Sequence, residues 1–383
     1  MASAAALPLR TLTFTAALVV VAGASRLPVR GLLEQWYTGP GKYSRIAATL
    51  IILLNIKNFP GMWHWRVLKG IFQHLSVSPP KIPAAVRPSV LFLPAIVPSY
   101  VPFSECDYNL HKSNSTYYSD LDVARSHLVC ALLQPGMHAL QNNVKNKLVL
   151  DSAGKPVRGK WGIMLGGVHC SFKREIKPYQ SYEMWTRLLC WDRKWIYVVT
   201  HFVKKGTVRP KAYVLSDGSW FGGKSYTFKG DEDSVEGAAA AVDDIDEKAI
   251  FASAISKYVI KLGRLTIHPE ITLAAAGYLP EDKPSGWATM ATTPSQTSGS
   301  TSVTAQDSGV STPVIVPGES DALDPAAAEE ATKDEEKSKP AWKKIVEENE
   351  RGLEIARHFG ALDELHSTFT GSKKAALGRF SDL

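Results

Sequence analysis

Cysteine is scarce in this chain, and no metal-binding spacing is present. The four cysteines, at positions 106, 130, 170 and 190 of 383 residues, show no C-x-x-C pair and no accompanying histidine cluster. Structural zinc sites need closely spaced cysteine and histidine ligands, so a zinc site is not expected. No cofactor is predicted. Four cysteines in a chain of this length do not make a disulfide scaffold, so free thiols in a reducing compartment are expected.

Two common catalytic motifs are missing or stand in the wrong context. The sequence has no G-x-S-x-G nucleophile elbow, which weighs against an α/β-hydrolase. Residues 218–225, GSWFGGKS, fit the expression for a nucleotide-binding P-loop. A P-loop must open a helix, however, whereas the residues that follow read as a strand and then as an acidic stretch. Nucleotide binding is therefore not predicted.

Acidic residues are almost absent from the N-terminal part. Residues 1–80 carry eight Lys or Arg and a single acid, Glu34, whereas the rest of the chain carries 36 basic and 36 acidic residues. The net charge of +7 therefore belongs to the N-terminal segment. Because this segment is also apolar, its charge indicates a membrane-surface segment or a targeting signal rather than a nucleic-acid-binding segment.

Long apolar runs are missing too, but two short ones occur, at residues 12–23 and 46–56. Both are shorter than the about 20 residues of a spanning helix. The first has the form of a signal-peptide core, with a mitochondrial transit peptide and an uncleaved anchor as alternatives. The second is followed by Trp63 and Trp65, a pattern typical of a membrane interface, with a buried helix as the alternative. Residues 1–80 are thus predicted to be membrane or targeting segments.

These features predict a membrane-associated protein. A glycosylation triplet begins at Asn114, inside a polar loop that is a candidate active-site loop because Asp107, Asn109, His111 and Asn114 crowd onto it. A glycan there would conflict with a working site, which favours a catalytic domain on the cytosolic side of an ER-type membrane. A mitochondrial location is the alternative.

A polar turn runs directly into a helix over residues 104–128. Asn114, Ser115 and Thr116 are typical N-cap residues, whose side-chain oxygens can accept from first-turn amides. One apolar face follows at helical spacing, at Tyr117, Leu121, Ala124, Leu128 and Leu132. Pro135 and Gly136 are expected to end this helix.

Strand patterns lie on both sides of this helix. Residues 90–103 read as one or two short strands, and their prolines favour the edge of a sheet. Segments rich in β-branched and aromatic residues then predict further strands at 161–176, 182–191, 194–204 and 249–262. Together these elements predict an α+β domain over residues 89–280, with an insertion at about 216–247.

The C-terminal part has a different composition. Residues 289–338 contain few large apolar side chains and many Ser, Thr, Pro, Ala and acidic residues, which predicts a disordered linker. A helix is predicted to resume over residues 341–366, where Trp342, Ile345 and Phe359 are scattered apolar positions. A partner-binding or membrane-surface helix would fit this pattern.

One motif resembles a known family. The pattern C-D-x-N-x-H-x-x-N-x-x-Y at residues 106–117, followed by Ala124 and Arg125, resembles the loop and central helix of hotdog-fold thioesterases. It is similar to the 4-hydroxybenzoyl-CoA and acyl-carrier-protein thioesterase branches, and most of all to the eukaryotic group called thioesterase superfamily member six and its fungal relatives. The strand and turn pattern of residues 162–203 also fits, so the resemblance covers about residues 90–205.

This resemblance implies an antiparallel sheet wrapped around a long central helix. It also implies hydrolysis of acyl-CoA or acyl-carrier-protein thioesters to a carboxylic acid and a thiol, in fatty-acyl or secondary-metabolite metabolism. Hotdog enzymes generally pair, with the active site at the subunit interface, so a homodimer is implied as well. A catalytically inactive hotdog that binds acyl chains or acts as a membrane scaffold is the alternative.

The resemblance also suggests catalytic residues. Asp107 matches the loop aspartate of 4-hydroxybenzoyl-CoA-type enzymes and would act as general base or nucleophile. His111 and Asn114 match an H-x-x-N pattern and would position water and the carbonyl oxygen. Asp122, on the helix, is the reserve carboxylate. Simpler roles are open for each: a turn cap, loop hydrogen bonds, and an ion pair of Asp122 with Arg125 three residues on.

Three more residues are assigned to substrate binding. Tyr117 opens the helix, although its place on the apolar face also favours packing. Lys173 and Arg174 follow a predicted strand and could bind the phosphates of CoA or of a carrier protein, with a solvated strand end as the alternative.

Overall fold

The computed structural model describes residues 28–77, 79–151, 153–208, 210, 213–215, 247–280 and 325–368. Its helices are α2 (Val29–Thr38), α3 (Lys42–Leu54), α4 (Met62–Phe72), α5 (Arg87–Val90), α6 (Asn114–Gln141), α7 (Asn143–Asn146), α9 (Pro269–Ala275) and α11 (Pro325–Gly360). Its strands are β1 (Ala95–Tyr100), β2 (Trp161–Phe172), β3 (Ser181–Trp191), β4 (Trp195–Lys204), β5 (Ile250–Leu262) and β6 (Leu265–Ile267). Short helical turns are η1 (Ile56–Asn58), η2 (Gln73–Val77), η3 (Ala84–Val86), η4 (Phe103–Glu105), η5 (Glu247–Ala249) and η6 (Ala361–Thr368).

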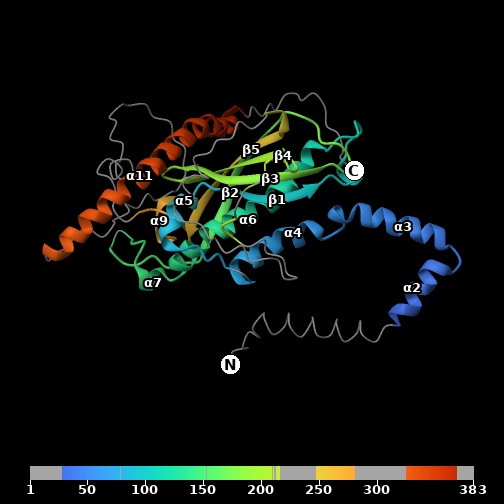
Figure 1. Ribbon diagram of the computed structural model, residues 1–383, viewed down its shortest axis with the longest axis horizontal. Helices are drawn as coiled ribbons and strands as arrows, with labels where there is room; N and C mark the ends of the chain where they lie inside the picture. Colours follow the sequence, from blue (N-terminus) through green and yellow to red (C-terminus); the bar gives the residue numbers. More distant parts are fainter. Residues whose placement is uncertain are drawn as a thin grey trace, which may run out of the picture.

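The strands form one antiparallel sheet in the order β1-β3-β4-β5-β2, and β6 pairs with β5 (Figure 1). Strand β1 lies at one edge of the sheet, where it pairs with β3, and it contains Pro98. Proline cannot donate a ladder hydrogen bond, which explains why this segment pairs on one side only. The predicted edge strand and the four predicted strands that follow the helix are confirmed, although β2 ends at Phe172 rather than at residue 176.

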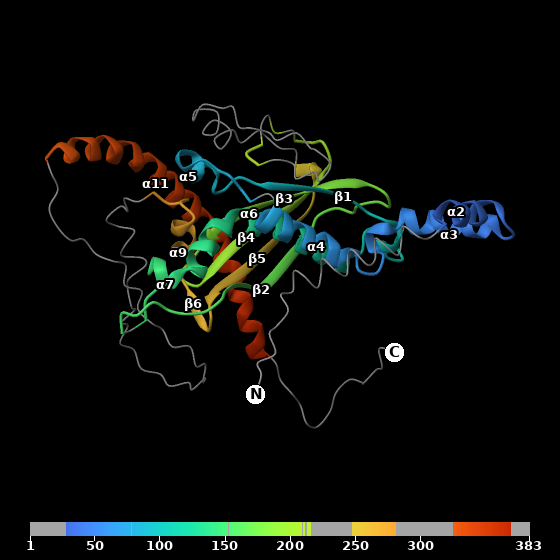
Figure 2. The ribbon, with the colours of Figure 1, turned by 90° about the horizontal axis from the view of Figure 1, so that it is seen from below.

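Helix α6 is the centre around which the sheet folds (Figures 1 and 2). Tyr117 and Leu121 on its apolar face pack against Met184 of β3 and Phe202 of β4, and all four side chains are buried. The recurrence of apolar residues every three or four positions turns this face towards the sheet along the first turns of the helix. An antiparallel sheet around a long central helix is the arrangement that the sequence predicts.

Helix α6 does not end at Pro135, and this part of the prediction is wrong. The helix contains Pro135 and continues to Gln141. Proline inside a helix costs about 3 kcal/mol, so packing must stabilise the second half. Leu133 and Leu140 on either side are buried in the core, and Gly136 brings the helix against α9. Tertiary contacts therefore outweigh the local helix-breaking signal.

Replacing Gly136 with alanine should destabilise the protein. A Cβ atom at this position would lie 2.2 Å from the carbonyl oxygen of Thr272 in α9. We expect a loss of about 1–3 kcal/mol in urea unfolding from overpacking, although alanine normally stabilises a helix relative to glycine. Gly360→Ala is the control, because a Cβ there has no neighbour within 4 Å. Equal stability of the two variants would contradict this account of the α6–α9 contact.

Helix α11 covers the opposite face of the sheet. Ala356 and Phe359 pack on Cys190 of β3 and Tyr197 of β4, side chains that point away from α6. Asn349 accepts a hydrogen bond from the Trp191 amide at 2.8 Å and donates to the Trp191 carbonyl at 3.2 Å. The helix predicted at 341–366 is thus part of the folded body, and its last residues belong to the turn η6.

Two predicted segments differ from the structure or lie outside it. The insertion at 216–247 is outside the described residues as far as residue 246, and so is the linker as far as residue 324. Residues 325–338, predicted to be disordered, form the first part of α11. Alanine, glutamate and lysine dominate this stretch, and these residues have high helix propensity although they bury little surface.

The N-terminal helices divide into two parts. Helices α2 and α3 extend away from the sheet as an arm, and no residue of α3 is buried (Figures 1 and 2). The second apolar run therefore forms an exposed helix, and the alternative of a buried helix is not observed. Helix α4 instead packs along α6, and so does the turn η2 that follows it, where His74 Nε2 lies 3.1 Å from His127 Nδ1 of α6.

Within the described residues, no helix has both the length and the apolarity needed to cross a membrane. The first apolar run, residues 12–23, lies outside the described residues.

Candidate active site

The candidate site is the loop between η4 and α6. Cys106 and Lys112 form an isolated β-bridge that brings the two ends of this loop together. Between them, the Asp107 amide donates to the His111 carbonyl at 2.9 Å, and the Leu110 amide donates to the Asp107 carbonyl at 3.0 Å. Leu110 has φ of 60°, a left-handed conformation that is costly for a residue with a side chain. The loop is therefore a tight turn whose backbone is held by its own hydrogen bonds.

Asp107 is half-buried at the first corner of this turn. Its Oδ1 atom accepts a hydrogen bond from the Asn109 amide at 2.9 Å, as in an Asx turn. The turn-capping role that the sequence left open is thus observed. It fixes the orientation of the carboxylate, and the other carboxylate oxygen can still face a water molecule or a carbonyl carbon.

The N-terminus of α6 begins directly after this loop. Its N-cap is Ser113, one residue before the predicted caps, and the Ser113 side chain makes no capping bond. The Ser113 hydroxyl lies 3.0 Å from the Ser115 hydroxyl instead. Asn114, assigned to the carbonyl oxygen, is the exposed first residue of the helix. First-turn amides without a side-chain cap carry partial positive charge and can stabilise a developing oxyanion.

The turn after β2 lies against the candidate loop. The Lys112 amide donates to the Ile176 carbonyl at 2.9 Å, and His111 Nε2 lies 3.1 Å from a Glu175 carboxylate oxygen. His111 is therefore bound to Glu175, and in the described residues no hydrogen bond joins its side chain to Asp107. Lys173 and Arg174 belong to the same turn, where their amides both bind the Phe251 carbonyl and their side chains are exposed.

Asp122 and Tyr117 make the contacts expected from the simpler of the two roles considered for each. Asp122 lies 2.5 Å from Arg125, whose Nη1 also donates to the Ser256 hydroxyl at 2.8 Å. Tyr117 is only 2% exposed and packs edge-on against Phe172 and Phe202. The apolar face of α6 places this ring in the core, as the packing alternative predicts, and its assignment to substrate binding stays a prediction.

The comparison with known proteins decides the family. The family model described as "Thioesterase-like superfamily" matches residues 101–229, which include the whole candidate loop. The probable thioesterase atnL of Emericella nidulans is 38% identical over 255 residues, which cover 65% of this chain and 74% of that protein. The chain belongs to the thioesterase-like superfamily. The resemblance inferred from the Cys106–Tyr117 pattern is thus confirmed.

Other relatives of this thioesterase-like chain extend the comparison. The thioesterase poxG of Penicillium oxalicum is 31% identical over 357 residues, which cover 92% of this chain and 94% of that protein. A match of this extent reaches into the N-terminal helices. The protein THEM6 of Xenopus laevis is 28% identical over 100 residues, which cover 26% of this chain and 39% of that protein. Membership of this family assigns thioester hydrolysis as the general activity.

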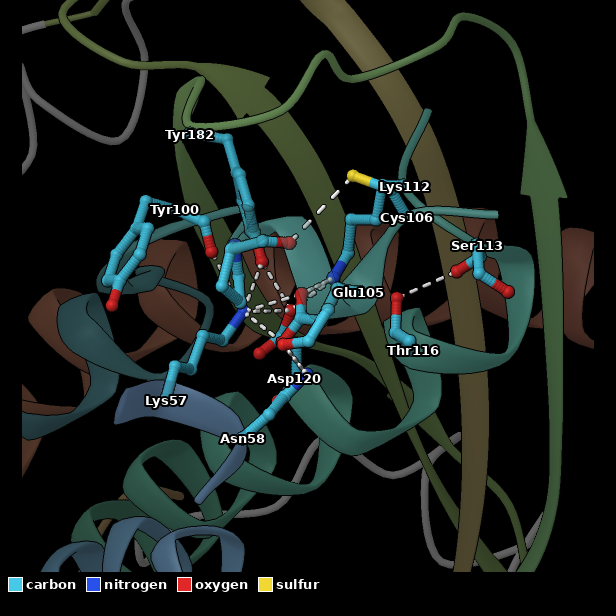
Figure 3. Close-up of polar contacts among 12 residues, drawn as sticks. Lys57, Asn58, Tyr100, Glu105, Cys106, Lys112, Ser113, Thr116, Asp120 and Tyr182 are labelled. Carbon is cyan, nitrogen blue, oxygen red and sulfur yellow. Dashed lines mark hydrogen bonds and ion pairs between the residues drawn. The ribbon is translucent and has the colours of Figure 1, made fainter. Parts of the chain in front are cut away.

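Beneath the loop of this thioesterase-like protein lies a cluster of buried charges that sequence reasoning missed (Figure 3). Lys57 Nζ lies 2.9 Å from the Glu105 carboxylate and 3.0 Å from Asp120 Oδ2. Lys112 Nζ binds the same two carboxylates, at 2.5 Å and 2.8 Å. These four side chains are at most 4% exposed, and Arg66 of α4 adds a contact to Asp120 Oδ1 at 2.7 Å.

The cations of the cluster favour the ionised form of Asp120. Burial alone would raise the pKa of Asp120, but the attraction of Lys57, Lys112 and Arg66 outweighs burial and lowers this pKa well below its usual value. Burial and the neighbouring Asp120 carboxylate raise the pKa of Tyr182, which donates a hydrogen bond to Asp120. The loop therefore rests on a buried network of ion pairs and hydrogen bonds, and the one sequence signal for it was a lysine directly after an apolar run.

Proposed function

We propose that the protein hydrolyses acyl thioesters of CoA or acyl-carrier protein, with Asp107 as the group that acts on the thioester. The observation that carries this proposal is the position of Asp107, whose carboxylate is fixed by the Asn109 amide just before the uncapped first turn of α6. A carboxylate and helix-start amides that no side chain caps, on one short segment, supply the base and the oxyanion donors that acyl transfer needs.

The proposed reaction uses these groups in sequence. Asp107 removes a proton from water as the water oxygen attacks the carbonyl carbon, and the first-turn amides of α6 stabilise the oxyanion. The C–S bond then breaks, and the proton held by Asp107 passes to the departing thiolate. Direct attack by the Asp107 carboxylate is the alternative first step, and water would then hydrolyse the resulting anhydride.

Charge near the loop supports a phosphate-bearing carrier. Lys173 and Arg174 are exposed on the turn that contacts the loop through Glu175 and Ile176. Their cationic groups suit the phosphates of CoA or the phosphopantetheine of a carrier protein. Release of a fatty-acyl or secondary-metabolite chain is the metabolic setting that we propose.

The test is thiol release by the full chain from acyl-CoAs of increasing chain length and from acylated carrier protein. We expect turnover with at least one of them and equal amounts of acid and thiol. If no thioester is cleaved, the alternative of an inactive acyl-binding hotdog becomes the better account.

The edge strand β2 supports a second copy of this chain as the partner. Among the described strands, β2 pairs only with β5 and so forms an edge of the sheet. Its side chains Met164 and Leu165 are 52% and 45% exposed. A long, exposed edge strand is a template for pairing with another chain. We propose a symmetric homodimer, which light scattering should report as twice the 41.8 kDa chain mass.

The arm supports the proposed membrane association. Its apolar side chains are exposed, with Leu50, Ile51 and Leu54 at 53%, 63% and 51%. Basic side chains and interfacial aromatics accompany them, and Arg45 stacks on Trp36 with 5.6 Å to the ring centre. An amphipathic, basic segment of this kind lies in the membrane surface. We propose the cytosolic side of an ER-type membrane, with mitochondria as the alternative.

Vesicle flotation should detect this surface. Ile51→Asp should weaken binding to vesicles with anionic lipid by about tenfold or more, since burying one isoleucine contributes about 1.5–3 kcal/mol. Ile355→Asp is the control, because Ile355 is similarly exposed, at 56%, but lies on α11. Equal loss in both variants, or no loss in either, would remove the arm as the membrane contact.

A further inference from the structure

The segment that follows the arm is bound to the backbone that leads into the candidate loop. The Ser104 amide donates to Asn55 Oδ1 at 2.9 Å, and Asn58 Nδ2 donates to the Ser104 hydroxyl at 3.2 Å. Lys57 Nζ donates to the Tyr100 carbonyl at 2.9 Å. Three side chains of one short turn thus bind the stretch between β1 and the loop, which a simple membrane tether would not require.

Lys57 makes the strongest of these links. In Figure 3 its side chain reaches from the N-terminal segment into the space between Glu105 and Asp120. Its ammonium group has four oxygen partners, the others being the Tyr100 carbonyl and the Tyr182 hydroxyl at 3.1 Å. A buried cation with partners in several directions fixes their relative positions, because any displacement leaves charge uncompensated.

The partners of Lys57 control both ends of the loop. Glu105 precedes Asp107, and its backbone carbonyl accepts from the Ser113 amide at 2.8 Å, where α6 begins. Lys112 closes the other end through its bridge with Cys106 and its contact with the Glu105 carboxylate. Lys57 binds Glu105 directly and reaches Lys112 through the shared carboxylates. The short turn that carries Asp107 lies between these two anchors.

We propose that Lys57 is a positioning residue for the reaction: it holds the two ends of the 105–112 loop and so fixes the place of Asp107 just before α6. The proposal rests on the function proposed above. The N-terminal segment is then a working part of the catalytic module, and it joins the membrane arm to the site through one buried side chain.

The experiment compares three full-length variants. Lys57→Met removes the charge, Lys57→Arg keeps the charge but alters its geometry, and Lys69→Met is the matched control on the exposed side of α4. The first measurement does not depend on activity: the rate at which iodoacetamide alkylates Cys106, followed by mass spectrometry. Burial, Glu105 and Asp107 raise the pKa of Cys106, so its thiol should react slowly while the loop is held in place.

We expect Lys57→Met to speed alkylation of Cys106 severalfold and to leave Cys130 unchanged. Cys130 lies on α6, and burial raises its pKa to about 11. In the second measurement, kcat should fall by about 100-fold with little change in KM, since a misplacement of about 1 Å has that effect. Lys57→Arg should fold normally and show a smaller loss of about tenfold, because a guanidinium does not reproduce the ammonium geometry. Lys69→Met should match the wild type in all measurements.

The pH profile separates positioning from a general loss of stability. Lys57, Lys112 and Arg66 all lower the pKa of Asp120, while buried Glu105 and Tyr182 face it as well. Removing Lys57 should therefore raise the pKa of Asp120, so that protonation of Asp120 loosens the loop at a higher pH. The acidic limb of kcat should move to higher pH while circular dichroism shows that the variant is still folded, which separates this shift from acid unfolding.

Each outcome is decisive. Wild-type alkylation of Cys106 and wild-type kcat in a folded Lys57→Met variant would overturn the proposal. If this variant does not fold, Lys57→Arg decides, and its wild-type behaviour in both measurements would also overturn the proposal. If the wild type cleaves no thioester, the proposed function fails, but Cys106 alkylation still shows whether Lys57 holds the loop.

Discussion

Replacing Asp107 with asparagine should lower kcat for thioester cleavage by about 10³-fold, within the range of 10²–10⁴ that general-base catalysis contributes. An asparagine cannot take a proton from water. Its side-chain oxygen can still accept from the Asn109 amide, so the turn and the melting temperature should not change. Steady-state thiol release and thermal unfolding of the same preparation measure both quantities.

Asp151→Asn is the matched control for this experiment. Asp151 also caps a turn, with its Oδ1 atom accepting from the Ala153 and Lys155 amides at 2.9 Å and 2.8 Å. The same chemical change in the same kind of turn should leave kcat unaltered there. Asp122→Asn should cost only the ion pair with Arg125. Full activity of the Asp107 variant together with an inactive Asp122 variant would transfer the chemistry to helix α6.

Removing residues 1–80 should unfold the protein rather than simply remove its proposed membrane contact. The truncation takes away Lys57 and Arg66, so Glu105 and Asp120 would share the single cation Lys112. Breaking one buried ion pair costs about 3–5 kcal/mol, against a total stability of about 5–15 kcal/mol for a typical domain. The truncation also exposes the α6 surface that α4 covers at Gly70, where a Cβ would lie 2.7 Å from the Ser126 hydroxyl.

A shorter truncation, of residues 1–41, is the control. It removes α2 but keeps Lys57 and α4, and it should leave the unfolding midpoint unchanged. The pKa of Asp120 is lower in the folded than in the unfolded protein, so its stabilisation is present above about pH 4 and is lost as pH falls. The difference in stability between the intact chain and residues 81–383 should therefore become smaller in acid. A chain of residues 81–383 with the midpoint of the full protein would contradict this view of the N-terminal segment.

Local patterns predicted most of the fold. The alternation and composition of β3, β4 and β5 placed these strands to within a residue or two, and the apolar face of α6 placed the central helix. Pro135 misled the prediction because its cost is local, whereas the contacts of Leu140 that outweigh it come from the rest of the core. A sequence pattern contains the local helix-breaking signal but not the long-range contacts that outweigh it.

The site was predicted in part for the same reason. The position of Asp107 in its loop and the pair of Asp122 with Arg125 follow from short spacings and from the family motif. Lys57 lies 63 residues before Asp120, and next to an apolar run it resembled a membrane-flanking charge. Only the three-dimensional arrangement shows that this charge points into the protein.

The position of helix α11 late in the sequence has a consequence for the newly synthesised chain. Asn349 of α11 binds Trp191, which lies 158 residues earlier, so the ribosome needs roughly 10 to 30 s to deliver the covering helix after the strand. During that interval the apolar patch around Cys190 and Tyr197, which α11 covers in the folded protein, is exposed to solvent. A nascent sheet with such an exposed patch is prone to aggregate with other chains. Chaperone binding to the nascent chain should therefore be strongest before α11 is synthesised and should fall once α11 packs on the sheet.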